Sequence, residues 1–117
     1  MKEIIKILQQ RGETIATMES CTGGYIASEI TNVSGSSDVF CLGLVTYHNE
    51  EKIKFGVKDK TIETYTVYSQ EVAKEMAKCA SEIAKAEWGI GTTGIIRKTR
   101  STKWQYSYTK SILCDLP

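Results

Sequence analysis

The sequence lacks three features that mark large classes of protein: paired cysteines, a long apolar run and an excess of one charge. Its four cysteines are widely spaced and none forms a CxxC pair, so it has no zinc or redox motif of that kind. No apolar segment is long enough to span a membrane and no secretory signal is present, so we expect a cytoplasmic protein. A net charge of +1 gives no general attraction to nucleic acid or to membranes.

The remaining composition is that of one small globular domain. The 117 residues are 41% hydrophobic and 25% charged, which is ordinary for such a domain and allows a modest core. The charge is uneven, because residues 97–117 carry a balance of +4 and leave −3 for the rest of the chain.

Helix-type and strand-type patterns alternate along the chain, and the strands lie too far apart for hairpins. This order predicts an α/β layered fold with at least some parallel pairing. The nearly continuous apolar run over 39–47 is typical of a strand covered on both faces. Residues 57–68 show no clear period and are predicted to be a connection. We expect further strands over 14–18 and from Trp88 into a turn at 92–94, and helices over 2–10, 25–31, 49–55 and 69–86.

The first strand leads into Ser20-Cys21-Thr22-Gly23-Gly24, a strand-to-helix turn with two glycines. Such a turn aims the first N–H groups of a helix at an anion or oxyanion, with Ser20 as a candidate nucleophile and Thr22 at or near the helix N-cap. The alternative is that both hydroxyls only cap the helix and the glycines only make the turn.

Ligands bind at the carboxyl ends of parallel strands, so we expect three strand ends to converge: 20–24, 46–52 and 92–94. A serine nucleophile needs a base. His48 is the single histidine, and a lone histidine is more often structural. Lys52 either points into water or is buried with a lowered pKa that suits a base. Tyr47 either assists at the site or packs in the core.

These residues belong to a longer series of motifs. In chain order they are Ser20 to Gly24, Gly35-Ser36-Ser37, Val45 to Lys52, and Val67-Tyr68-Ser69. The series resembles the CinA C-terminal domain family, the nicotinamide-nucleotide amidases or NMN deamidases. The family pattern is close to E-S-C-T-G-G, G-S-S, V-T-Y-x-N-x-x-K and V-S-x-x-V.

The resemblance implies a three-layer α/β/α domain around a mixed, partly parallel sheet. It also implies hydrolysis of the carboxamide of nicotinamide mononucleotide to nicotinate mononucleotide and ammonia, without a metal or cofactor. The implied roles are Ser20 as nucleophile, Lys52 as base and Tyr47 as an assisting group. We expect a small nucleotide as partner, no nucleic acid or membrane, and a homo-oligomer. The predicted substrate-binding residues are Thr22, Gly23, Gly24, Ser36, Ser37, Thr93 and Gly94.

The resemblance stops after Thr93-Gly94-Ile95, because the family's A-G-P-x-G-G segment is absent and the single proline is Pro117. We therefore predict an incomplete amidase-like domain over 1–95 and a divergent basic tail over 96–117. A shifted reading frame or a truncated gene is one hypothesis for the tail, which translation of the downstream DNA in other frames tests. The alternation of Trp104, Tyr106 and Tyr108 predicts a strand added at the sheet edge. The open alternative to an amidase is an inactive remnant that keeps the fold and phosphate binding.

Overall fold

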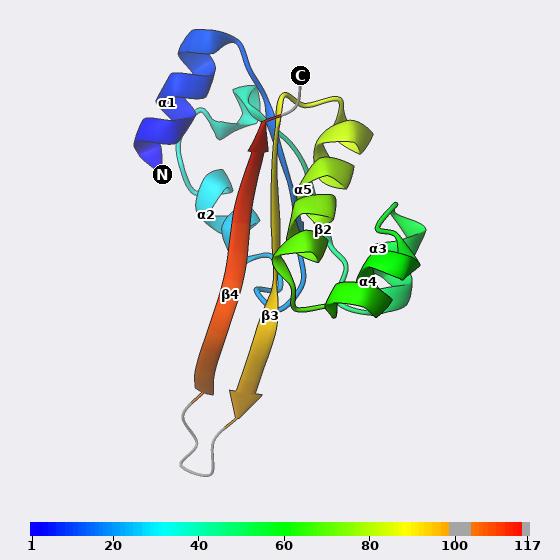
Figure 1. The fold of residues 1–117 in the computed structure, drawn as a ribbon. Helices are drawn as coiled ribbons and strands as arrows, with labels where there is room; N and C mark the ends of the chain where they lie inside the picture. Colours follow the sequence, from blue (N-terminus) through cyan, green and yellow to red (C-terminus); the bar gives the residue numbers. More distant parts are fainter. Residues whose placement is uncertain (99–103, 116–117) are drawn as a thin grey trace.

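The computed structural model describes residues 1–98 and 104–115, which form one α/β domain (Figure 1). Helices and strands alternate along most of it, as the sequence predicts. The elements are α1 (Lys2–Arg11), β1 (Ile15–Glu19), α2 (Tyr25–Thr31), the 3-10 turn η1 (Ser36–Asp38), β2 (Phe40–Val45), α3 (Asn49–Lys54), α4 (Asp59–Tyr65), α5 (Gln70–Ala84), β3 (Trp88–Lys98) and β4 (Trp104–Asp115).

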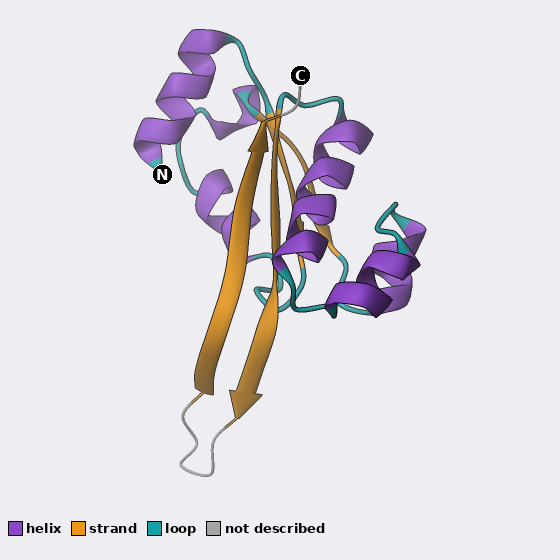
Figure 2. Ribbon diagram, viewed as in Figure 1, coloured by secondary structure: helices purple, strands orange, loops and turns teal. Residues whose placement is uncertain are grey.

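Four strands form one mixed sheet in the order β2-β1-β3-β4. The strands β2, β1 and β3 run parallel, while β4 runs antiparallel to β3. The pairing of β3 with β4 extends from Trp88↔Asp115 to Lys98↔Trp104 and runs past the end of β1 (Figure 2). The mixed sheet and the added edge strand are therefore confirmed. The expectation that no two strands are close enough for a hairpin is wrong for β3 and β4, which are consecutive and pair antiparallel.

Helices cover both faces of the sheet, which gives the three layers that the sequence predicts. On one face, α1 and α2 bury an apolar cluster around Ile5, Leu8 and Ile30. On the other face, α5 packs its buried stripe against Met18 and its neighbours in a second cluster. No helix in the described residues is long and apolar enough to cross a membrane.

The contact between α5 and β3 is unusually close because β3 presents glycines to the helix. An added Cβ on Gly89 would overlap the carbonyl oxygen of Ala77, and one on Gly91 would overlap that of Ala73. The two backbones therefore touch with no side chain between them, which only glycine allows.

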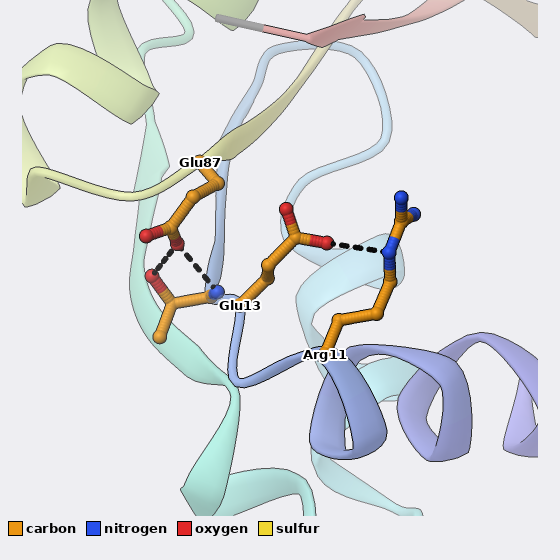
Figure 3. A network of polar contacts seen from close by, with 4 residues as sticks. Arg11, Glu13 and Glu87 are labelled. Atoms are coloured by element: carbon orange, nitrogen blue, oxygen red, sulfur yellow. Dashed lines mark hydrogen bonds and ion pairs between the residues drawn. The ribbon is translucent and has the colours of Figure 1, made fainter. Parts of the chain in front are cut away.

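A polar junction joins the starts of β1 and β3 (Figure 3). Glu87 accepts hydrogen bonds from the backbone N–H of Thr14 at 2.7 Å and from its hydroxyl at 2.9 Å. Both donors favour the charged carboxylate and lower the pKa of Glu87 below its ordinary value of 4.5. Beside them, Arg11 pairs with Glu13 at 3.0 Å. The junction holds β1 and β3 in the register that pairs Ile15 with Trp88.

The structure corrects three of the sequence predictions. The 57–68 connection contains the helix α4. Little of this helix is buried beyond Ile62, so its sequence lacks the apolar spacing that predicts a helix. The strand β2 lies at the sheet edge with alternate residues exposed, so it is not covered on both faces. The turn at 92–94 is wrong, because β3 continues to Lys98 with only a register shift between Thr93 and Ile95, where β4 pairs beside it.

Candidate active site

A cleft of about 170 Å³ opens where the parallel strands end, between β1, β3, α3 and the start of α5. Its lining includes Ser20 after β1, Lys52 on α3, and Thr93 and Gly94 on β3. The hydroxyl of Thr93 donates to the carbonyl of Val67 at 2.8 Å and ties β3 to the segment before α5. The cleft therefore brings together residues from the three predicted segments, although Thr93 and Gly94 lie within β3 and not at its end.

Lys52 and Ser20 form a buried pair in this cleft. The Lys52 Nζ lies 2.9 Å from Ser20 Oγ, and their exposed fractions are 1% and 7%. The same Nζ donates to the backbone carbonyls of Thr46 at 2.6 Å and Tyr47 at 3.2 Å. Lys52 is thus held by neutral acceptors and points directly at the serine oxygen.

Burial lowers the pKa of Lys52 below its ordinary value of 10.5, because the charged ammonium loses its hydration. A negative charge on nearby Cys21 acts in the opposite direction and is the smaller effect. Of the two possibilities that the sequence leaves open for Lys52, the structure selects the buried one.

Tyr47 lines the cleft but its side chain lies outside the pair, and His48 is not among the lining residues. The Tyr47 ring is 66% exposed and stands edge-on to the His48 ring, with centroids 6.3 Å apart. Its carbonyl, not its phenol, contacts Lys52. His48 is exposed and is the N-cap residue of α3.

The N-terminus of α2 is already occupied by a side chain of this chain. The Glu19 carboxylate accepts from the N–H groups of Ile26 at 2.9 Å and Ala27 at 3.0 Å. Gly24, not Thr22, is the N-cap residue, and Thr22 instead bonds Glu19 at 2.7 Å. The interpretation of these two helical N–H groups as an anion site is therefore wrong.

Five of the predicted substrate-binding residues, all within the described chain, lie outside the cleft lining: Thr22, Gly23, Gly24, Ser36 and Ser37. The two serines are in η1, ahead of β2, whose first residue pairs with Ile15 at the far end of β1. At about 3.3 Å per residue, the length of β2 separates them from the cleft by roughly 20 Å. Their role in binding stays a prediction.

The lining also includes residues to which the sequence analysis gave no site role: Cys21, Asn49, Val67, Tyr68 and Ile95. The position of Val67 and Tyr68 in the chain could have predicted their place in the cleft. They precede α5, which returns to β3, so the start of that helix lies at the carboxyl ends of the strands. In the described part of the chain, no group of three or more His, Cys, Asp or Glu side chains is placed to hold a metal ion.

The sequence and the fold both match known proteins. The family model of the CinA C-terminal domain matches residues 1–105. The chain belongs to the CinA C-terminal domain family. The match runs past the boundary at 95 that the motifs predict, and the division of the chain there stays a prediction.

Relatives and solved structures of the CinA family agree with this assignment. A protein of Caldanaerobacter subterraneus subsp. tengcongensis, named as competence-damage inducible, is 55% identical over 97 residues. That alignment covers 81% of this chain and 24% of the relative. A CinA-like protein of Kosmotoga olearia is 43% identical, over 85% of this chain and 24% of its own length. This chain therefore spans about a quarter of the length of these curated relatives.

The fold matches crystal structures of the CinA superfamily. A superfamily protein from Escherichia coli superposes with a TM-score of 0.79 at 25% identity, over 99% of this chain and 74% of that chain. The competence/damage inducible protein from Agrobacterium tumefaciens gives 0.78 at 29% identity, over 97% of this chain and 75% of its own.

Proposed function

We propose that this chain is an amidohydrolase that converts the carboxamide of nicotinamide mononucleotide to the carboxylate and ammonia, with Ser20 as nucleophile and Lys52 as base. The observation that carries the proposal is the 2.9 Å contact between Lys52 Nζ and Ser20 Oγ in a cleft at the strand ends. The nucleotide substrate comes from the resemblance of the motifs, and the relatives' names do not mention it.

The surroundings of Lys52 suit a neutral amine as well as an ammonium. An ammonium donates three hydrogen bonds and has no lone pair. When the proton is lost, the two remaining N–H groups satisfy the carbonyls of Thr46 and Tyr47, and the lone pair faces the Ser20 hydroxyl. Burial favours this neutral form, so Lys52 is prepared to accept the serine proton.

The reaction then needs no further base. Ser20 Oγ attacks the carboxamide carbon while its proton passes to Lys52 Nζ. The tetrahedral intermediate collapses, the C–N bond breaks, and the ammonium of Lys52 returns the proton to the leaving nitrogen, which departs as ammonia. Water attacks the resulting ester while Lys52 accepts a proton from it. The C–Oγ bond then breaks, the ammonium of Lys52 returns the proton to Ser20 Oγ, and the product leaves as the carboxylate and a proton. Tyr47 assists through its carbonyl, which orients Lys52.

Ammonia release from nicotinamide mononucleotide by the purified chain tests the proposal. We expect Ser20→Ala to abolish turnover and Lys52→Ala to lower kcat by about 10²- to 10⁴-fold, the usual contribution of a general base. Lys54→Ala is the matched control, because Lys54 is an exposed lysine of the same helix. It should leave the rate unchanged.

Full activity in Ser20→Ala would refute the nucleophile. A folded wild-type chain that releases no ammonia would favour the alternative, a domain that keeps the fold without the activity.

A further inference from the structure

One buried ionisable group, Glu19, takes no part in the proposed reaction. Its exposed fraction is 0%, and it stands directly before Ser20 at the end of β1. A buried carboxylate is costly unless donors satisfy it. Three donors do so: the backbone N–H groups of Ile26 and Ala27 and the hydroxyl of Thr22.

These bonds fix the turn that carries the nucleophile. The Glu19 carboxylate spans from the end of β1 to the first turn of α2, so the intervening residues 20–24 are held at both ends. Within the turn, the N–H of Gly23 donates to the carbonyl of Ser20 at 3.0 Å. The Thr22 hydroxyl also lies 2.9 Å from that of Thr92 on β3, beside Thr93 in the cleft wall.

Glu19 and Ser20 point in opposite directions. Glu19 contacts α2, whereas Ser20 contacts Lys52 on α3. Glu19 is therefore bonded on the α2 side of the turn and is not part of the cleft lining.

We propose that Glu19 is a positioning residue for Ser20, which acts through the first turn of α2 and through the Thr22–Thr92 contact. This inference rests on the proposed nucleophile. In Glu19→Gln one carboxylate oxygen becomes an NH₂ group, which cannot accept from a backbone N–H. At least one of the two helical N–H bonds or the Thr22 bond is then lost, and the turn loosens.

The test measures the reactivity of Ser20 itself, apart from any nucleotide substrate. An alkyl fluorophosphonate reacts with an activated serine: a bond forms from Oγ to phosphorus, the P–F bond breaks, fluoride leaves and the serine proton passes to the base. Labelling rates are followed by intact-protein mass spectrometry over a pH series. We expect Glu19→Gln to lower the maximal rate by between about 10- and 100-fold, the effect of misplacing a reactive group by up to roughly 1 Å.

The pH midpoint of labelling separates positioning from a change of base. It should stay at the wild-type value in Glu19→Gln, because Lys52 and its carbonyl partners are untouched. Thr22→Val should slow labelling, whereas Thr22→Ser keeps the hydroxyl and should restore it. Glu29→Gln, the same change on α2 outside this network, should label at the wild-type rate.

The outcomes are distinct. Wild-type rates in both Glu19→Gln and Thr22→Val would overturn the positioning role and leave Ser20 and Lys52 in place. If the wild-type protein is not labelled, or if Lys52→Met labels as fast as wild type, the proposed nucleophile pair falls and the positioning role falls with it. Circular dichroism checks that each variant folds. If Glu19→Gln does not fold, the comparison of Thr22→Val with Thr22→Ser tests the positioning role.

Discussion

Lys52 is a buried lysine that donates to a hydroxyl and two carbonyls, and the effect of burial on its pKa outweighs the opposing charge on nearby Cys21. The folded protein therefore holds the Lys52 proton less tightly than the unfolded chain, whose lysine has a pKa near 10.5. Between the two pKa values the unfolded chain binds more protons. In that window the free energy of unfolding rises with pH.

Lys52→Met removes this titration, so the variant should lack the rise. We expect the free energy of unfolding of the wild type, relative to Lys52→Met, to increase as the pH rises from the lowered folded-state pKa toward 10.5, with a slope of at most about 1.4 kcal/mol per pH unit. Urea denaturation at several pH values measures it. Lys54→Met is the control and should keep the wild-type slope. Parallel curves for wild type and Lys52→Met would show that Lys52 is protonated equally in both states.

The sequence identified Ser20 and Lys52 but not the burial of the lysine. Lys52 lies among Glu50, Glu51 and Lys54, so its neighbours in sequence predict an exposed helix. Its burial depends on how α3 packs beside the end of β1, which is a tertiary contact. Glu19 escaped notice for the same reason, because two of its three donors lie seven and eight residues further along the chain.

At the scale of elements, the contact of α5 with β3 sets how much change the fold tolerates. Gly91→Ala would place a methyl group against the backbone of Ala73 and Ala77, which cannot move without shifting the helix. We expect the free energy of unfolding to fall by about 3 kcal/mol, at the upper end for overpacking. Thermal or urea denaturation measures the loss.

Gly12→Ala is a matched comparison, because a Cβ there meets open space and only the left-handed backbone, with φ of 64°, resists it. It should cost about 1–2 kcal/mol. A loss in Gly91→Ala no larger than that in Gly12→Ala would mean that α5 can move away from β3 at little cost.

The regular elements followed from local pattern, and the exceptions had non-local causes. The helix α2 has the predicted bounds, since apolar spacing and the preceding glycines define it within the sequence. By contrast, the edge position of β2 depends on the order of strands in the sheet, which its apolar run does not encode. The length of β3 depends on β4, its partner from the tail.

At the scale of the whole molecule, the ionisation of Glu87 makes the free energy of unfolding depend on pH in the acid range. Its pKa is lowered in the folded state by the two Thr14 donors, so its stabilising contribution is full above pH 4.5 and is lost as the pH falls through the lower folded value. Glu87→Gln should therefore melt below the wild type at pH 7, by a difference that narrows as the pH falls to 3. Differential scanning calorimetry at the two values measures this.

Glu82→Gln is the control, because the Glu82 carboxylate is exposed and its ion pair with Lys78 is at 4.0 Å. It should melt close to the wild type at both pH values. A Glu87→Gln deficit that persists unchanged at pH 3 would contradict the assigned role of the carboxylate.

The hydrogen bond from Thr93 to the carbonyl of Val67 joins two parts of the cleft wall, β3 and the segment before α5. Because this bond joins the two segments, the width of the cleft is already fixed in the unliganded protein. A ligand that enters then orders few protein torsions, and the conformational entropy lost by the protein on binding is small. Molecules are accordingly selected at this cleft by whether their reactive end fits a fixed aperture.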